Sequence, residues 1–433
     1  MEKPMVPVKK YQSNLAYSSG IQAYLYSQPL MKMATIMQKH TSHTPLNKFN
    51  HHRDLVDHTF SEFVSPNNDT LYSFAWLDLT NGPIELSIPA IKNRYFTFQF
   101  LDMYTNVYGY IGARMENKNG GTFLIIGTDY KGSIPKNRDV IKSPHNMTWV
   151  IGRTLIDGPK DLNAVHDLQD QYLLKPYKKN EKKTPTYLPY LSESEYKDPK
   201  KYFSNVAHLM KMYPPLPEDR ALLPQLEQVG IDYKNGTMKD SNSATMDGLK
   251  RAVMDAEEII LNSRNDVGHL VNNWTIHYEN IGEFNEHYLF RAITAQFGIG
   301  ANLTQEAMYP RALLDSKGRP LMGENKYVLH FEKDELPKVN SFWSLSMYGA
   351  NQLFVRNPID RFSIGDRTEG LTYNEDGSLD IYIQGSSPVR KESNWLPSPT
   401  SEKFNVVLRM YLPKQEVTNG TYKLPGIKKV NEC

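Results

Sequence analysis

Two short segments in which aromatic residues recur at every second position constrain the fold of this 433-residue chain more than any other feature. In the first, residues 68–79, one parity is occupied by Thr70, Tyr72, Phe74 and Trp76. In the second, residues 95–101, one parity is occupied by Phe96, Phe98 and Phe100. Successive side chains of a β-strand point to opposite faces, so each segment predicts a strand with a strongly apolar face.

The same alternation returns in the last third of the chain. Strand-like runs occupy residues 327–331, 342–348, 379–383 and 404–412. Asp376 and Gly377 form an Asp-Gly pair of the kind that closes a hairpin turn. Strands joined by such short connections pair antiparallel, which is typical of a sandwich or a jelly roll.

Helical spacing marks the beginning and the middle of the chain. Apolar residues recur at intervals of three and four over residues 14–40, where Pro29 predicts a kinked or two-part helix. The same spacing predicts helices over residues 246–260 and 284–297. The predicted fold class is therefore α+β and β-rich, with an N-terminal β-sandwich-like domain, a helical middle section and a C-terminal antiparallel jelly-roll-like sandwich.

The length of the chain is about three times that of a typical domain, which indicates more than one core. The expected divisions are an N-terminal helical segment (1–45), a β-rich domain (46–175), a linker with a helical section (176–310) and a jelly-roll-like domain (311–433). The linker includes a basic, Pro-bearing stretch at residues 178–185, which we interpret as solvated rather than phosphate-binding.

Composition narrows the classes of partner. Lys and Arg total 50 and Asp and Glu total 48, so no strong field attracts nucleic acid or an anionic membrane surface. No run approaches the ~20 apolar residues that cross a bilayer. The first thirty residues lack the continuous apolar core of a secretory signal, which favours a cytoplasmic protein, or an exported one if a leader was removed. The single cysteine, Cys433, argues against a disulfide or a thiolate metal cluster.

Several motifs resemble a known two-domain family. Those in the first half occupy residues 66–73, 99–106, 151–154 and 168–172, and those in the last third occupy residues 342–348, 357–359, 364–367 and 391–397. The first set resembles the domain of unknown function numbered 1254, and the second set resembles the domain numbered 1214. The resemblance implies a β-sandwich-like domain followed by a jelly-roll-like domain, with helices packed between or around them. It implies nothing definite about activity, because fold does not determine function.

Three acids are candidate catalytic residues: Asp69, Asp102 and Asp366. Asp102 shares the parity of the three phenylalanines, so its carboxylate is expected to point toward the apolar face. A buried carboxylate is either a general acid or base, or one half of a structural ion pair. Its candidate partners are Arg94, Arg114 and Arg153.

A ligand rim is one interpretation of the polar segment before the first strand. Asn68, Thr70 and Tyr72 share one face, a polar-to-aromatic gradient suited to a sugar or another polyol. The alternative is that short polar side chains at this position bond to nearby backbone and fix a turn. Tyr104, Arg153 and Tyr348, which lie in the matched motifs, complete the predicted binding residues of these segments.

A second polar group lies in the C-terminal third. Arg361, Asp366 and Arg367 either grip a carboxylate or phosphate bidentately or lock their loop by internal salt bridges. Lys391 and Trp395 form a further polar and aromatic cluster. If the two clusters meet across the sheet, they make a pocket.

No metal is predicted, and the sequence leaves any cofactor unidentified. His51, His52 and His58, and the pair Glu283 and His287, do not form a three-ligand set at a recognised spacing. The chain also lacks a phosphate-binding loop, a nucleophile elbow and a dinucleotide fingerprint. The predicted function is binding of a polar small molecule or saccharide in a pocket of the β-domains. A hydrolase or lyase that uses Asp, Arg and Tyr groups and a homo-oligomeric assembly protein are the alternatives.

Overall fold

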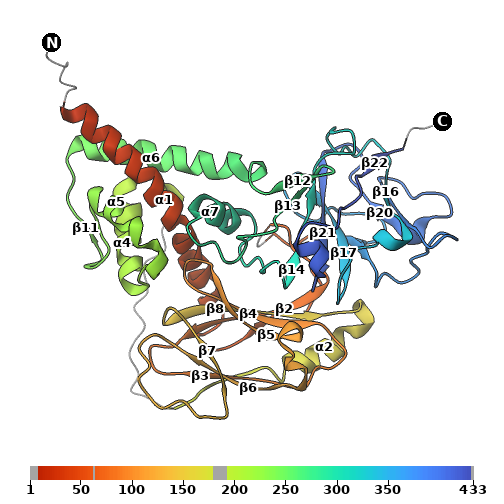
Figure 1. The fold of residues 1–433 in the computed structure, drawn as a ribbon, viewed down its shortest axis with the longest axis horizontal. Coiled ribbons are helices and arrows are strands. Elements are labelled where there is room, and N and C mark those ends of the chain that lie inside the picture. The colour runs from red at the N-terminus through yellow and green to blue at the C-terminus, as the bar shows by residue number, and fades with distance from the viewer. Residues whose placement is uncertain (1–7, 62–63, 179–192, 431–433) are drawn as a thin grey trace.

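The computed structural model describes residues 8–61, 64–178 and 193–430, so most of the basic stretch at 178–185 lies outside the described residues. The fold is α+β, with mainly antiparallel sheets and a helical middle section, as predicted. The first β-domain, the helices and the C-terminal sheets occupy three corners of the molecule (Figure 1). Among the described helices, none is long and apolar enough to span a membrane.

Two sheets form the first β-domain. One has the order β1 (Asn50–His51), β2 (Thr70–Asp78), β8 (Met147–Leu155), β4 (Phe96–Leu101) and β5 (Val107–Gly112). The other has the order β7 (Asp139–Lys142), β6 (Gly121–Ile126), β3 (Ile84–Ile88) and β9 (Leu173–Pro176). The β6–β7 pair is parallel and the other pairs are antiparallel.

The five-stranded sheet is buried on both faces, which explains the aromatic alternation. Leu77 of β2 packs in the core between the two sheets, whereas Phe74 and Trp76 join a core shared with the helices. Trp76 stands opposite Trp149 of β8, and their rings stack with centroids 5.5 Å apart. All nine residues of β2 are consequently buried.

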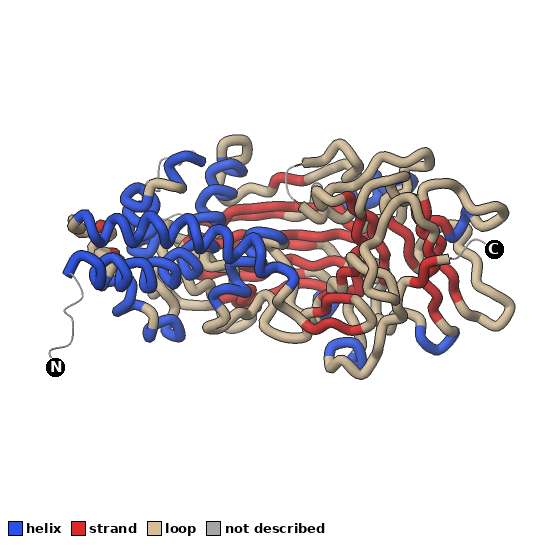
Figure 2. Tube along the Cα trace, turned by 90° about the horizontal axis from the view of Figure 1, so that it is seen from above, coloured by secondary structure: helices blue, strands red, loops and turns tan. Residues whose placement is uncertain are grey.

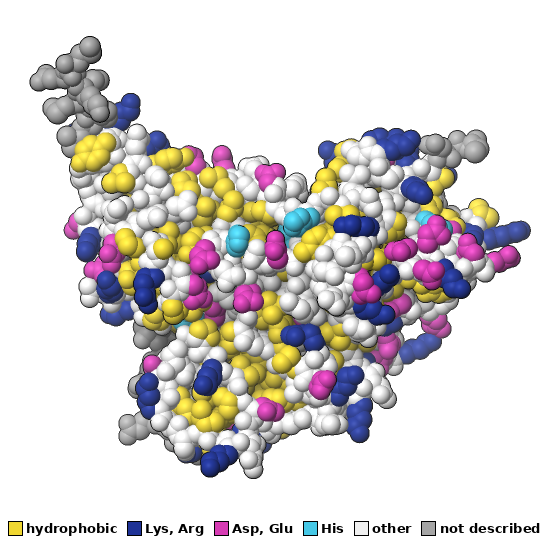
Figure 3. Space-filling view, viewed as in Figure 1, with side chains coloured by type: hydrophobic (Ala, Val, Ile, Leu, Met, Phe, Trp, Pro, Cys, Tyr) yellow, Lys and Arg dark blue, Asp and Glu magenta, His cyan; other side chains and the backbone are white. Residues whose placement is uncertain are grey.

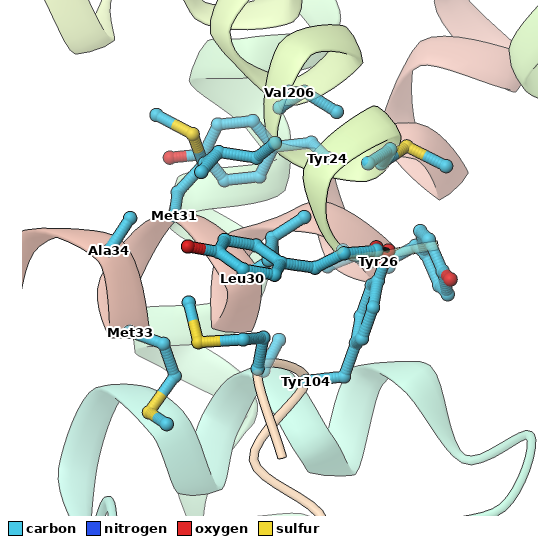
Figure 4. Close-up of a cluster of buried hydrophobic side chains, with 14 of the residues drawn as sticks. Tyr24, Tyr26, Leu30, Met31, Met33, Ala34, Tyr104 and Val206 are labelled. Atoms are coloured by element: carbon cyan, nitrogen blue, oxygen red, sulfur yellow. Dashed lines mark hydrogen bonds between the residues drawn. The ribbon is translucent and has the colours of Figure 1, made fainter. Parts of the chain in front are cut away.

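The helical section covers the second face of that sheet. It is built from α1 (Val8–Thr41), α4 (Pro199–Met212), α5 (Leu223–Gln228), α6 (Ser243–Asn262) and α7 (Tyr288–Phe297). Pro29 lies inside α1, which is a single helix. Helices α1 and α6 lie side by side (Figure 2), so close that a Cβ on Gly248 would lie 2.2 Å from the Ser13 carbonyl oxygen. Tyr104 of the first β-domain reaches into this core beside Tyr26 (Figure 4).

Two further sheets form the C-terminal part. The seven-stranded sheet has the order β12 (His269–Val271), β13 (Trp274–Ile276), β15 (Arg311–Ala312), β21 (Phe404–Tyr411), β17 (Trp343–Gly349) and β18 (Ser363–Gly365), with β14 (Ala307–Met308) also paired to β21. The four-stranded sheet has the order β20 (Trp395–Pro397), β19 (Leu379–Gln384), β16 (Tyr327–Phe331) and β22 (Lys428–Lys429). The two sheets share one apolar core, and the β19–β20 pair is parallel.

One face of the seven-stranded sheet is polar and is turned toward the first β-domain. The core side of β21 carries Val406, Leu408 and Met410. Val407 and Arg409 therefore point to the opposite face. The register places Arg311 opposite Val407, and Ser344 opposite Arg409. This polar face positions the candidate site.

Candidate functional site

Two cavities lie where the polar face meets the first β-domain. Their volumes are about 210 Å³ and about 300 Å³. Residues 65–70 separate them, because Ser65 and Asn67 line the first whereas Asn68 and Asp69 line the second. We name the first the arginine cavity, after Arg153, Arg264, Arg311 and Arg409, and the second the ion-paired cavity, after Asp69, Asp157 and Arg367.

All three parts of the molecule contribute walls to the arginine cavity. Arg153 comes from β8 of the first β-domain. Ile293 and Phe297 come from α7, and Arg311 and Arg409 come from the seven-stranded sheet. A cavity at such a junction is a common location for a small-molecule site.

Two of the four arginines are deeply buried. Arg153 is 7% exposed and Arg409 is 5% exposed. Arg153 donates to the Gln99 side-chain oxygen at 2.7 Å and to the Gly300 carbonyl at 2.8 Å. Arg409 donates to the Ser65 carbonyl at 2.8 Å. These hydrogen-bond partners are neutral. Asp69, whose carboxylate bonds to Arg367, acts on Arg409 through its charge and helps to raise the pKa of that guanidinium.

Gly300 is specifically suited to its place under Arg153. Its φ of 79° lies in the left-handed region that favours glycine. A Cβ added there would lie 2.6 Å from the Ile151 Cδ1 atom. A larger residue would displace the carbonyl that holds Arg153.

The other two arginines are half-buried. Arg264 donates to the Gln352 side-chain oxygen at 3.3 Å, and its guanidinium lies 4.5 Å from the Phe297 ring centroid. Arg311 donates to the Asn405 side-chain oxygen at 3.2 Å. Burial lowers the pKa of Arg264 to about 10. Burial, together with the charge of Arg264, lowers the pKa of Arg311 to about 9.

The arginine cavity has a one-sided charge. The described residues that line it include no Asp and no Glu. His277 also lines it, and burial lowers the pKa of this imidazole to about 4, with a smaller contribution from His269. The histidine is therefore neutral near pH 7, and the positive charge comes from the arginines.

The polar segment before β2 forms a turn, as one of the two interpretations predicted. The Asn67 side-chain oxygen accepts hydrogen bonds from the backbone N–H groups of Asp69 and Thr70, both at 3.0 Å. Thr70 is buried in this turn. Tyr72, a predicted binding residue, lines the arginine cavity with its ring centroid 5.7 Å from the Arg153 guanidinium.

The ion-paired cavity differs because its arginine has two carboxylate partners. Arg367 bonds to Asp69 at 3.0 Å and to Asp157 at 2.9 Å. Its guanidinium also lies 4.3 Å from the Phe342 ring centroid. The second Asp69 oxygen accepts from the Ser344 hydroxyl at 2.6 Å. These contacts join the two β-domains.

Asn68 and Tyr348 hold the same segment against the sheet. The Asn68 side-chain oxygen accepts from the Ser363 hydroxyl at 2.8 Å. The Tyr348 hydroxyl donates to the Pro66 carbonyl, and the Tyr348 ring centroid lies 5.6 Å from the Arg409 guanidinium. Both predicted binding residues therefore lie at the domain junction.

Asp366 is adjacent to Arg367 in sequence but makes different contacts. Its side chain is exposed, and one oxygen accepts from the Trp343 backbone N–H at 3.2 Å. Desolvation raises the pKa of Asp366 to about 6, Asp69 adds to the rise, and Arg367 opposes it. Asp366 is not among the described residues that line either cavity.

Asp102 and Tyr104 lie away from both cavities. Asp102 is 1% exposed, and one of its oxygens accepts from the backbone N–H groups of Tyr104 at 2.8 Å and Asn106 at 2.9 Å. The Tyr104 hydroxyl donates to the Tyr213 carbonyl at 3.0 Å. Asp102 thus closes a turn, and its proposed role as a catalytic acid stays a prediction.

The predicted cationic partners of Asp102 bond elsewhere. Arg94 pairs with Asp161. Arg114 pairs with Glu306 at 2.7 Å. Arg153 lies in the arginine cavity.

Arg361, Lys391 and Trp395 form a separate cluster at β20. Arg361 donates to the carbonyls of Glu392 at 2.7 Å and Trp395 at 2.9 Å. Lys391 is exposed, with its ammonium 5.9 Å from the Tyr382 ring centroid. Arg361 thus holds its loop through backbone carbonyls, and these three residues do not line either cavity.

Sequence reasoning placed Tyr72 and Arg153 among the binding residues but missed three of the cavity arginines. Arg409 could have been identified as a candidate, because a cation inside an apolar strand-like run needs a partner. Arg264 and Arg311 lie in short segments without periodicity, so the sequence offered no comparable signal. In the part of the chain that the structure describes, no three His, Cys, Asp or Glu side chains group as a metal site.

The fold and its cavities define a protein of two β-rich domains joined by helices, with a cation-lined cavity at the junction. Residues 46–176 match the family model "Protein of unknown function (DUF1254)", and residues 306–415 match "Protein of unknown function (DUF1214)". The chain therefore belongs to the two-domain family in which the first domain is followed by the second.

Solved structures share this fold. The VPA0106 protein from Vibrio parahaemolyticus is 23% identical with a TM-score of 0.72, over 97% of this chain and 100% of that chain. A putative uncharacterized protein from Burkholderia cenocepacia is 10% identical with a TM-score of 0.50, over 97% of this chain and 96% of that chain. No match is found among curated proteins.

Proposed function

We propose that the protein binds a small organic anion in the arginine cavity. The observation that carries this proposal is that four guanidinium groups border one cavity whose described lining contains no carboxylate. Arginine is the residue best suited to bidentate recognition of carboxylate and phosphate.

Electrostatics favour an anion over a neutral saccharide. Moving a cation out of water without a counter-charge is costly, and hydrogen bonds to neutral groups compensate only part of that cost. Arg153 and Arg409 are both deeply buried with neutral partners. An anion between them would supply the missing charge, whereas a sugar hydroxyl would only add another neutral partner.

The size and the apolar lining limit the ligand further. A volume of about 210 Å³ is below the ~300 Å³ at the lower end for drug-sized ligands. Ile293, Phe297 and Val407 line the cavity between charged groups. The ligand we propose is therefore a small acid with a hydrocarbon part, which narrows the polar small molecule predicted from sequence.

Thermal unfolding with a ligand panel tests this proposal. The panel contains short carboxylates, inorganic phosphate and neutral sugars at equal ionic strength. A ligand at 100 times its Kd stabilises the native state by about 2.7 kcal/mol, so an organic anion should raise the Tm by several degrees. A panel in which sugars raise the Tm and anions do not would contradict the proposal.

A matched pair of variants connects the effect to the cavity. Arg153→Gln should abolish the anion-dependent rise in Tm, because it removes one of the two deeply buried guanidinium groups that line the cavity. Arg356→Gln removes the same charge at an exposed position and should leave the rise unchanged. Equal losses in both variants would indicate a general charge effect.

A further inference from the structure

The four arginines of the arginine cavity fall into two pairs. Arg153 and Arg409 form the buried pair. Burial raises the pKa of the Tyr309 phenol, and the positive charges of both arginines partly oppose that rise. Arg264 and Arg311 form the half-buried pair, since the charge of Arg264 acts on Arg311. Each pair draws its members from different parts of the chain.

The sheet register fixes the spacing between the pairs. Arg311 stands opposite Val407, and Arg409 is two residues further along the same strand. Diagonal neighbours of this kind in an antiparallel pair lie ~7–8 Å apart. Arg311 donates to Asn405, which lies on the side of Val407 away from Arg409, whereas Arg409 donates to Ser346 of β17, so the two guanidinium groups are held apart.

The residue between the pairs is apolar. Val407 shares the face of Arg409 and lines the cavity between the two cationic positions on the sheet. Phe297 of α7 lines the same cavity, with the Arg264 guanidinium over its ring. The cavity thus presents cations on both sides of an apolar patch.

We propose that the ligand is a short dicarboxylate, with one carboxylate bound by Arg153 and Arg409 and the other by Arg264 and Arg311. This rests on the proposed function, which requires only one anionic group. The hydrocarbon spacer lies against Val407 and Phe297. The length of the spacer determines whether both carboxylates are bound.

Isothermal titration calorimetry tests the proposal on the wild-type chain. Succinate, glutarate and adipate are compared with butyrate, pentanoate and hexanoate, which have the same numbers of carbon atoms and a single carboxylate. A second bidentate contact should tighten binding by about tenfold or more at the best spacer length. If each dicarboxylate binds no tighter than its monocarboxylate, the inference fails and the proposed function stands. If neither class binds, the proposed function fails.

The double variant Arg264→Gln, Arg311→Gln assigns the second carboxylate. It should remove the advantage of the dicarboxylate and leave monocarboxylate affinity within about twofold, since independent contacts are close to additive. Equal weakening of both classes would overturn the two-pair assignment. Circular dichroism confirms folding of the variant, and the spacer-length series on the wild-type chain needs no variant.

Discussion

The two cavities at the domain junction hold the same cationic residue in opposite electrostatic settings. In the ion-paired cavity, Arg367 bonds to the carboxylates of Asp69 and Asp157. In the arginine cavity, Arg153 and Arg409 bond to carbonyl, amide and hydroxyl oxygens. Residues 65–70 lie between the two settings.

This difference separates a structural contact from a binding site. A guanidinium with its carboxylates already in place joins two domains, and an incoming anion would have to displace those carboxylates. A guanidinium with neutral partners keeps its charge available for a ligand at some cost to the ligand-free fold. The outer surface does not show this difference between paired and unpaired arginines, because Lys and Arg are interspersed with Asp and Glu on the face shown in Figure 3.

The largest effect is expected from Asp69→Asn. The substitution keeps the size of the side chain but leaves Arg367 with Asp157 as its remaining carboxylate partner. Removing one member of a buried pair typically costs 3–5 kcal/mol, and because Arg367 is 24% exposed we expect about 3 kcal/mol in the free energy of unfolding. Urea denaturation measures this.

Asp157→Asn is the control for that experiment. Its carboxylate bonds to the same guanidinium but is 61% exposed, so the loss should be less than about 1 kcal/mol. If both variants unfold at the wild-type urea midpoint, the ion-paired cavity is not the structural tie between the domains.

Much of the fold was predictable from the sequence because its signals are local. The two strands predicted from alternating aromatic residues, β2 and β4, were confirmed. Both are buried along their whole length because both faces of their sheet are covered. Helix α6 contains the predicted residues 246–260, whereas α7 begins at Tyr288, four residues later than predicted. The strand β9 was not predicted, because it pairs with β3, which lies far away in sequence. Such pairing leaves no periodic signal in the short segment itself.

The candidate site was predictable only in part because it depends on contacts between distant segments. Asp69 and Arg367 were both predicted, yet their pairing across 298 positions could not be inferred. Asp102 was correctly expected to be buried, but its partners are the backbone N–H groups of its own turn. The arginine cavity requires the register of β15 and β21, which the sequence does not contain.

The next prediction concerns the stability of the arginine cavity without a ligand. Arg311→Met should change the ligand-free free energy of unfolding by less than about 1 kcal/mol, because relief from burying a charge offsets the lost hydrogen bond to Asn405. Urea denaturation without ligand measures this change. A loss close to the ~3 kcal/mol expected for Asp69→Asn would assign Arg311 a structural role and remove the contrast between the cavities.

The smallest effect is expected at Asp366, the acid beside Arg367 that does not pair with it. The ordinary pKa of its carboxyl is 3.8, and desolvation raises the pKa in the folded chain to about 6. Below about pH 3 the carboxyl is largely protonated in both states. As pH rises toward about 6, the unfolded chain releases its proton first, so the native state loses stability, and above that pH the full penalty remains.

Asp366→Asn should therefore stabilise the protein at neutral pH and have almost no effect at about pH 3. The amide oxygen can still accept the hydrogen bond from the Trp343 N–H, so the charge is the main difference. Because the side chain is exposed, solvent screening limits the gain to a few tenths of a kcal/mol (about 0.5 at most). Paired Tm measurements at the two pH values test this sign. A variant that is less stable than wild type at neutral pH would show that Arg367 stabilises the charged Asp366. The Arg367 guanidinium would then be shared among three carboxylates, and the electrostatic contrast between the two cavities would be larger still.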